Sequence, residues 1–161
     1  MNIYLVQHGK PAPKEEDPKK PLSEEGIEDI KKTAAFLKNA CRIQVKEIFH
    51  SGKTRAKQTA EILCSSLIPE KEPQEKAGLA PLDDVKIISE EIAQMRDDCM
   101  LVGHLPHLAR LTSYLTTGSV SNTLVGFQQG GVVCLRPHDE EEVWTIAWML
   151  IPEIIRVTDR S

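Results

Sequence analysis

The feature that most constrains the fold of this chain is a short apolar segment at its start, which stops abruptly at a polar turn. The segment reads Asn2-Ile3-Tyr4-Leu5-Val6, and Gln7-His8-Gly9 follows it directly. A nearly continuous apolar run of this length is typical of a strand that is buried on both faces. Strands of that kind belong to parallel sheets, which need helices on both faces, so the segment favours an α/β fold.

Helices and further short strands are expected to alternate after this first strand. Ser23 is a residue type that caps helices, and Glu24 and Glu25 suit the positive end of the helix dipole. The expected segments are a helix carrying Ile27, Ile30, Ala34 and Leu37, a strand at Glu47–His50, a turn and cap at Ser51–Thr54, a helix carrying Ala56, Ala60, Leu63 and Leu67, a helix capped by Asp83 or Asp84 and carrying Val85, Ile88, Ile92 and Met95, a strand at Met100–Val102, and a helix that begins near Pro106.

The last third of the chain changes character. Segments 131–136 and 143–150 are rich in β-forming residues, and the polar segment Pro137–Glu142 joins them, so an antiparallel hairpin is predicted. Together with the alternating strands and helices, this predicts a three-layer α/β/α fold with a mainly parallel central sheet and a C-terminal antiparallel hairpin. At 161 residues, the chain has the length of one domain, which we expect to span 1–161.

Composition excludes several classes of protein. The formal net charge is −4 and aromatic residues make up 4% of the chain, which argues against a nucleic-acid-binding platform. The apolar run at 146–151 is too short to span a bilayer. Four cysteines without a CxxC pair are expected to be buried, reduced thiols, and no secretory signal is visible at the start. We therefore expect a cytoplasmic protein with no nucleic-acid or membrane partner.

Three polar residues follow predicted strands at equivalent places. His8 follows the first strand, Arg55 lies in the first turn of the helix after the second, and His104 follows the strand at Met100–Val102. Because ligands bind at the carboxyl ends of parallel strands, we expect the three side chains to converge. Arg can hold a phosphoryl group with two parallel hydrogen bonds, and a neutral imidazole can attack phosphorus. Singly, each residue is more often structural, so the combination carries the hypothesis of a phosphate site.

The segments around these residues resemble the motifs of a known family. Gln7-His8-Gly9 is similar to an Arg-His-Gly signature, and Pro21-Leu22-Ser23-Glu24-Glu25-Gly26 to a Pro-Leu-Thr-x-x-Gly helix start. The segment 51–59 resembles Ser-Pro-x-x-Arg-Ala-x-Gln-Thr, and Val102-Gly103-His104-Leu105-Pro106 resembles the segment with the second histidine. The family is the histidine phosphatase superfamily, and the chain is most similar to its SixA phosphohistidine phosphatase branch.

The resemblance implies a mechanism and a set of roles. His8 would attack the phosphoryl group and become transiently phosphorylated, with Arg55 and His104 as the other catalytic residues. Gln7, Gly9, Arg55 and His104 would bind phosphate, and neither a metal nor another cofactor is implied. The implied partner is a phosphohistidine-bearing protein or a small phosphorylated substrate.

The chain departs from the family pattern at two positions. Gln7 stands where the family has its first arginine, and Gly52 stands where it has proline. Glutamine keeps a hydrogen-bond donor but loses the charge, which Lys10 or Lys53 could replace. A glutamate acid found in some branches has no match here. Glu75, Asp83 and Asp84 lie in that region, although helix capping is the better account of the two aspartates.

Three functions remain open on the sequence alone. The first is a cofactor-independent phosphatase that acts through a phosphohistidine intermediate on phosphohistidine in a protein. The second is a weakly active or inactive relative that binds phosphate or a phosphoprotein, which Gln7 favours. The third is a small-molecule phosphoesterase, with the proline-rich loop Lys10–Pro21 as part of its pocket.

The remaining histidines and acidic residues suggest little chemistry. His104 and His107 have a possible metal spacing, but no third ligand is identifiable, so no metal site is predicted. His50 is interpreted as a strand-end residue and His138 as a turn residue. The acidic run Asp139–Glu142 is interpreted as a solvated turn.

Overall fold

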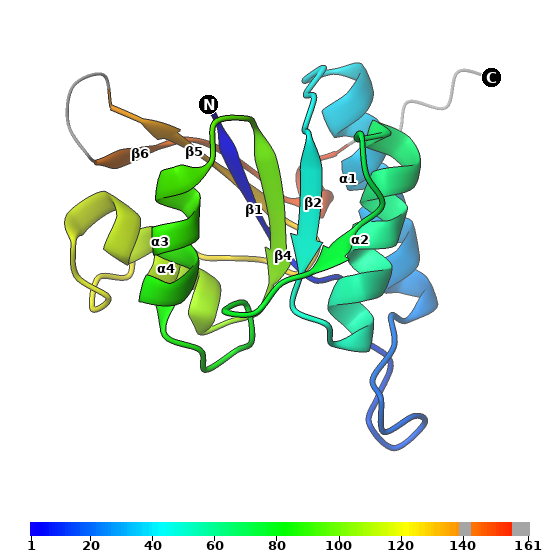
Figure 1. The fold of residues 1–161 in the computed structure, drawn as a ribbon. Helices are drawn as coiled ribbons and strands as arrows, with labels where there is room; N and C mark the ends of the chain where they lie inside the picture. The colour runs from blue at the N-terminus through cyan, green and yellow to red at the C-terminus, as the bar shows by residue number, and fades with distance from the viewer. Residues whose placement is uncertain (139–142, 156–161) are drawn as a thin grey trace.

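A computed structural model describes residues 1–138 and 143–155, in which a six-stranded sheet has the order β3-β2-β4-β1-β5-β6. Figure 1 shows helices on both sides of this sheet. The strands β3, β2, β4 and β1 are parallel, and β5 and β6 are antiparallel. The elements are β1 (Ile3–Gln7), α1 (Glu24–Asn39), β2 (Glu47–His50), α2 (Thr54–Leu67), β3 (Gln74–Glu75), α3 (Val85–Gln94), β4 (Cys99–Gly103), α4 (His107–Thr117), β5 (Val132–Pro137), β6 (Trp144–Leu150) and the 3₁₀ turn η1 (Pro152–Ile154). The predicted fold class is confirmed.

Two apolar cores separate the three layers. One lies between the sheet and α1 and α2, and includes Val6, Ile30 and Leu63. The other lies between the sheet and α3 and α4, and includes Leu5, Ile88 and Leu108. Successive residues of a strand point to opposite faces, so β1 contributes to both cores, and all five of its residues are buried. This burial confirms the prediction that the first strand lies inside a sheet.

Helix α1 begins where its sequence signals place it. The Ser23 hydroxyl accepts a hydrogen bond from the Gly26 N–H at 3.0 Å, and Glu24 and Glu25 occupy the first turn. Ser23 also donates through its N–H and its hydroxyl to the Lys10 carbonyl, at 2.9 and 3.0 Å. A Cβ at Gly26 would overlap that same carbonyl. The helix start therefore holds the chain that leaves β1, and only glycine allows it to pass so closely.

The strand order brings the predicted site together. In the sheet β4 lies between β2 and β1, so the segments that leave these three strands are neighbours. The His8 N–H donates to the Gly103 carbonyl at 3.1 Å, which ties the exits of β1 and β4 to each other. The backbone of His8 is thereby held in place independently of the contacts of its side chain.

Several details differ from the sequence-based expectations. Helix α2 has Lys53 as its N-cap with no side-chain hydrogen bond, because a lysine side chain offers no acceptor. Asp84, not Asp83, caps α3, and that helix ends before Met95. The two-residue strand β3 falls between α2 and α3, where no strand was expected.

The expectation of four buried thiols is wrong. All four cysteines are free, but Cys41 is exposed and Cys64 is half-buried, while Cys99 and Cys134 are buried. Cys41 follows the end of α1, where the chain turns over the surface. Cysteine is usually a buried residue type, but this tendency alone could not predict that Cys41 is exposed. The acidic run 139–142 lies outside the described residues, and no described helix is long and apolar enough to cross a bilayer.

Candidate active site

Two histidines and one arginine meet at the carboxyl end of the parallel strands, as predicted. The ring centres of His8 and His104 lie 4.9 Å apart with their planes inclined by 50°. The Arg55 Nε–H donates to Nε2 of His8 at 3.4 Å. Both imidazoles are buried, with 7% and 1% of their surface exposed, and Arg55 is half-buried. Three residues that are far apart in sequence thus form one cluster.

The hydrogen bonds of His8 fix its tautomer. Nδ1 lies 2.7 Å from the Gly9 carbonyl oxygen, which can only accept, so Nδ1 carries the proton. A neutral imidazole has one N–H, and Nε2 therefore holds a lone pair. The Arg55 guanidinium donates to that lone pair. The structure thus presents Nε2 of His8 as an unprotonated nitrogen beside a fixed positive charge.

The surroundings keep His8 neutral at physiological pH. The pKa of His8 is lowered to about 4, chiefly by burial; the Gly9 carbonyl opposes this shift, and the positive charges of Arg55 and Lys20 add to it. Burial is the largest cause because an imidazolium loses its hydration there. The resting state therefore has the lone pair that a nucleophile requires.

His104 has a partner that sequence analysis did not identify. Its Nε2 lies 2.6 Å from the Ser51 Oγ, while its buried Nδ1 has no hydrogen-bond partner among the described residues. Burial lowers the pKa of His104 to about 3, and His8, Arg55 and Lys53 act in the same direction. An orphaned buried lone pair is tolerated better than an orphaned buried N–H, which favours the proton on Nε2. His104 then donates to Ser51 while no anion is bound.

Two further residues of the 51–59 segment hold the site together from outside. The Thr59 hydroxyl donates to the Arg55 carbonyl at 2.8 Å and accepts from the Gly9 N–H at 3.0 Å. The Gln58 side chain accepts from the Leu22 N–H at 2.7 Å. The bonds to Gly9 and Leu22 join α2 to the chain that follows β1. The motif residues after Arg55 therefore position the cluster and do not enter it.

Gly9 and Gln7, the other two residues predicted to bind phosphate, lie next to His8 in the chain. Both backbone groups of Gly9 already have partners, since its N–H is bound to Thr59 and its carbonyl to His8. Gln7 is 8% exposed, and its Oε1 is buried with no hydrogen-bond partner in the described part of the chain. Gly9 acts through His8, and the Gln7 amide makes no hydrogen bond to the cluster.

The lysines near the site are arranged differently from the expectation. Lys10 forms an ion pair with Glu25 at 2.6 Å, so its charge is already compensated. Lys53 is exposed at the start of α2, and its charge lowers the pKa of His104. Lys20, from the loop, is half-buried and lowers the pKa of His8. Lys20 and Lys53 therefore supplement Arg55, and Lys20 was not identified from the sequence.

Gly52 is built into this site in a way that proline could not be. Its φ is +90°, a left-handed conformation that the proline ring forbids, and its N–H donates to Nδ1 of His50 at 3.1 Å. A Cβ there would overlap the Glu75 carboxylate. A proline at position 52 would therefore not fit the loop after β2 in its present conformation.

The other acidic candidates have structural partners. Asp84 accepts from the Lys86 N–H at 3.0 Å as the cap of α3, and Asp83 accepts from the Ala80 N–H at 3.0 Å. Among the described residues, no carboxylate makes a hydrogen bond to His8 or His104. His107 is fully buried, and the described residues contain no group of three ligands that could hold a metal.

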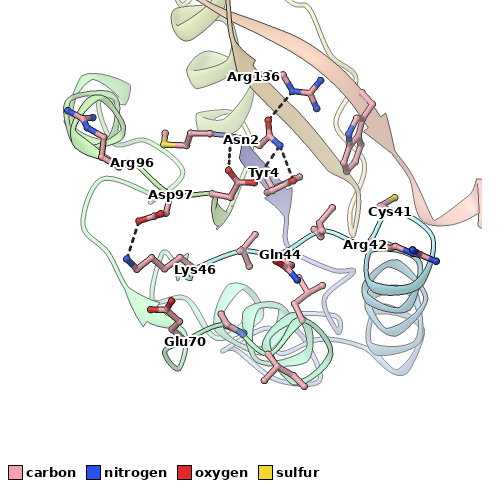
Figure 2. Close-up of a pocket in the computed structure, with 18 residues that line it drawn as sticks. Asn2, Tyr4, Cys41, Arg42, Gln44, Lys46, Glu70, Arg96, Asp97 and Arg136 are labelled. Atoms are coloured by element: carbon pink, nitrogen blue, oxygen red, sulfur yellow. Dashed lines mark hydrogen bonds and ion pairs between the residues drawn. The ribbon is translucent and has the colours of Figure 1, made fainter.

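A polar cavity of about 860 Å³ lies at the opposite end of the strands (Figure 2). Its polar groups largely satisfy one another. Asp98 accepts from the Asn2 N–H at 2.7 Å, Arg136 donates to the Asn2 side chain at 3.0 Å, and Lys46 pairs with Asp97 at 3.1 Å. None of the clustered histidines lines this cavity. The predicted chemistry therefore belongs to the carboxyl end of the sheet.

Comparison with known proteins gives the cluster a context. The family model described as histidine phosphatase superfamily (branch 1) matches residues 3–83. This match includes His8 and Arg55 but ends before His104, which only the fold brings to the site. No curated protein is significantly similar in sequence to the chain.

Solved structures share the fold at low sequence identity. The protein histidine phosphatase SixA, solved with tungstate, superposes with a TM-score of 0.84 at 22% identity, over 97% of this chain and 100% of that chain. A mycobacterial glucosyl-3-phosphoglycerate phosphatase gives 0.73 at 16% identity, over 91% and 97%. The alpha-ribazole phosphatase from Shigella flexneri gives 0.72 at 14% identity, over 91% and 94%.

Proposed function

The chain belongs to the histidine phosphatase superfamily, and from this premise we propose that it hydrolyses phosphohistidine in a protein through a phosphorylated His8. The observation that carries the proposal is the state of His8. Its Nδ1–H is held by the Gly9 carbonyl, and its Nε2 lone pair lies beside Arg55. A nucleophilic imidazole needs this tautomer, and a phosphoryl group needs this neighbouring cation.

In the first step, Nε2 of His8 forms a bond to phosphorus as the bond from phosphorus to the leaving group breaks. The electron pair of that bond leaves with the leaving group. The His8 ring gains positive charge, which the Gly9 carbonyl stabilises through Nδ1–H. Arg55 turns its donors from the ring to the phosphoryl oxygens, where negative charge is held.

His104 completes the cradle of the phosphoryl group. Its Nε2–H, which donates to Ser51 in the resting state, is 2.6 Å from that hydroxyl and faces the same cluster. When a phosphoryl oxygen arrives, the N–H can donate to it, while the Ser51 hydroxyl remains as a second donor. In the second step, the oxygen of a water molecule forms a bond to phosphorus as the phosphorus–Nε2 bond breaks. The electron pair of that bond returns to Nε2 of His8, and the protons of the water leave with the inorganic phosphate.

The absence of an assigned acid favours phosphoramidates among possible substrates. An alkoxide is a poor leaving group and needs a proton from a positioned acid. Among the described residues no carboxylate is bonded to the cluster. The P–N bond of phosphohistidine is intrinsically labile, so weak acid assistance suffices. The similar fold of the protein histidine phosphatase SixA supports the same substrate class.

Two alternative functions keep specific support. Phosphatases of small molecules share the fold, including one for glucosyl-3-phosphoglycerate, which supports a small phosphorylated substrate. Gln7 lacks the charge of the family's arginine, which supports a weakly active relative that mainly binds phosphate or a phosphoprotein.

The four free cysteines agree with a reducing, cytoplasmic setting.

A substrate panel tests the proposal. The purified protein is given a phosphohistidine peptide, a sugar phosphate and an alkyl phosphate, and phosphate release is followed under identical conditions. We expect the largest kcat/KM for the phosphohistidine peptide. Faster turnover of the sugar phosphate would favour the small-molecule function, and tight binding of the peptide without release would favour the binding function.

A further inference from the structure

A second cavity begins one residue before His8. It has a volume of about 340 Å³ and lies between the end of β1, the first half of α1, the segment before β5 and η1. We call it the Gln7 pocket, after the residue that joins it to the active site. Its walls include Gln7, Lys10, Glu25, Asp29, Phe127 and Glu153. Two of these wall residues, Gln7 and Lys10, flank the His8–Gly9 segment in the chain, and consecutive Cα atoms are about 3.8 Å apart.

The Gln7 amide has an unmet hydrogen-bonding capacity at this wall. The residue is 92% buried, since 8% of its surface is exposed, and its Oε1 has no partner among the described residues. A buried amide oxygen without a donor is unfavourable because it has lost its hydrogen bonds to water. This oxygen has almost no accessible surface, so a ligand N–H in the Gln7 pocket would satisfy it once the amide turns toward the cavity. An anion would not, because it offers only acceptors.

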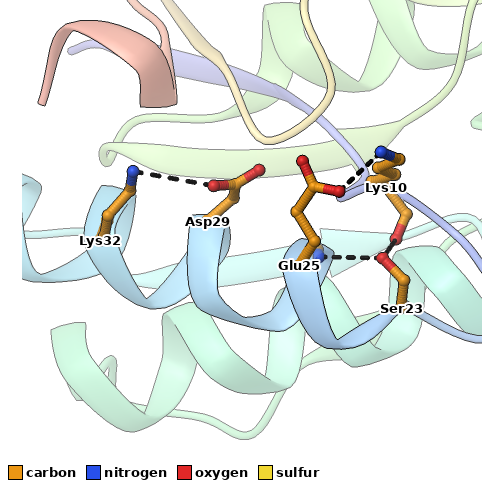
Figure 3. Close-up of polar contacts among 6 residues, drawn as sticks. Lys10, Ser23, Glu25, Asp29 and Lys32 are labelled. Carbon is orange, nitrogen blue, oxygen red and sulfur yellow. Dashed lines mark hydrogen bonds and ion pairs between the residues drawn. The ribbon is translucent and has the colours of Figure 1, made fainter.

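The charges of the walls also favour a ligand with a positively charged N–H donor. Three carboxylates face one ammonium, since Glu25, Asp29 and Glu153 line the pocket with Lys10. Figure 3 shows Glu25 and Asp29 projecting from the same face of α1, one turn apart. Lys10 binds Glu25 at 2.6 Å, so an ammonium already fits against this wall.

Not all of the negative charge is compensated. Asp29 has a longer contact of 3.8 Å with Lys32, which lies outside the walls. Glu153 has no ion pair among the described residues. The described residues also contain no set of three ligands suited to a metal ion, so an organic cation is the better match to these walls.

We propose that the Gln7 pocket binds an ammonium or guanidinium group that the phosphorylated substrate carries beside its phosphoryl group. This inference rests on the proposed function and narrows it to cationic substrates, such as a phosphohistidine with a neighbouring lysine or arginine. It also accounts for Gln7 itself. An arginine at this position would repel the substrate's cation, whereas the amide oxygen accepts a hydrogen bond from it.

Two peptides test the inference. They carry the same phosphohistidine and differ only in the flanking residues, which are lysine in one and alanine in the other. We expect the lysine peptide to have a kcat/KM about two- to fivefold larger, in the range of partly exposed charge pairs. Equal values for two peptides that are both hydrolysed would overturn the inference and leave the phosphatase proposal intact.

Variants of the walls should move this ratio in opposite directions. Glu153→Gln removes the carboxylate without an ion pair and should lower the ratio of lysine to alanine peptide toward one. Lys10→Met frees Glu25 and should raise the ratio, an increase that loss of stability cannot mimic. The matched control is Glu28→Gln on α1, because Glu28 is exposed and does not line the pocket. A ratio unchanged in both wall variants contradicts the inference.

Binding of small molecules separates this inference from the phosphatase proposal. Calorimetry compares ω-aminoalkyl phosphates of two to six carbons with alkyl phosphates of the same length, with or without turnover. Tighter binding of the amines, lost in Glu153→Gln, supports the pocket even if neither peptide is hydrolysed. Equal binding at every length, with no lysine preference, overturns it. If only the aminoalkyl phosphates bind more tightly than their alkyl counterparts, the cation belongs to a small substrate. If only the lysine peptide is preferred over the alanine peptide, the cation belongs to a protein.

Discussion

The Ser51 hydroxyl lies 2.6 Å from Nε2 of His104, so the serine that precedes α2 holds the ring of the second histidine. At the start of α2, Lys53 is the N-cap and its side chain makes no capping hydrogen bond. The Ser51 hydroxyl accepts from the Lys53 N–H at 3.4 Å, so this one serine links the helix start to the second histidine of the proposed phosphate site.

Removing this hydroxyl should slow turnover. Ser51→Ala deprives the His104 Nε2–H of its resting partner and the phosphoryl group of a donor. A hydrogen bond of this kind is worth about 0.5–1.5 kcal/mol, so kcat/KM should fall by roughly two- to tenfold. Ser51→Thr restores the hydroxyl and should recover most of the loss. Steady-state kinetics of the three proteins decide the matter, and an unaffected alanine variant would leave Ser51 without a role.

The lowered pKa values of the two histidines predict how stability depends on pH. In the folded protein the pKa is about 4 for His8 and about 3 for His104, against 6.5 for an ordinary histidine. As pH falls below 6.5 the unfolded chain binds protons that the folded protein refuses, so stability falls. Each group contributes a slope of up to about 1.4 kcal/mol per pH unit.

Urea unfolding between pH 6.5 and 5 measures this slope. His8→Gln and His104→Gln should each flatten it, because each removes one proton taken up on unfolding. His50 and His107 keep part of the slope in both variants, since burial lowers the pKa of each. Slopes identical to that of the native protein would show that the two imidazoles are not held neutral by the fold.

Restoring the family's charge at position 7 should accelerate the reaction on a substrate that lacks a cation. A charged donor makes hydrogen bonds about twice as strong as a neutral one, and Gln7→Arg should raise the rate by roughly ten- to a hundredfold if the deficit is about 1.5–3 kcal/mol. The adjoining cavity gives the larger side chain room. Kinetics on one neutral phosphoramidate compare the two proteins. Equal rates, or a slower variant, would mean that Lys20 and Lys53 already supply the charge.

Activity should survive chelation of metal ions. Arg55 and the two imidazoles supply the positive charge and the donors, and the described residues offer no set of three metal ligands. Phosphate release in EDTA should therefore match that of the untreated protein. A complete loss that added metal reverses would contradict this prediction.

The fold could be predicted from the sequence because the patterns that mark its strands and helices are local. Continuous burial of residues 3–7, the Ser23 cap and the apolar stripe of α1 each follow from spacing alone. Strand β3 could not be found in this way. It has two exposed residues and exists only because β2 pairs with it, so nothing in its own side chains marks it.

The site was accessible only in part. His8, Arg55 and His104 could be proposed together because each follows a strand, and strand ends converge in a parallel sheet. The bond from Ser51 to His104 was not predictable, since a serine before a helix usually caps it. Lys20 itself has a left-handed backbone conformation, with φ at +49°, in an irregular loop. No periodic pattern in the sequence predicts where such a residue places its side chain.

The most direct test of the account is the site and chemistry of the phosphate captured during turnover. The protein is quenched while it hydrolyses a labelled phosphohistidine peptide, and the bound phosphate is assigned by its acid lability, its base stability and peptide mapping. We expect the label on His8, no label in His8→Ala, and slow labelling of His8 in His104→Ala. Label that persists without His8, or that maps to His104, would contradict the assignment of His8 as the nucleophile.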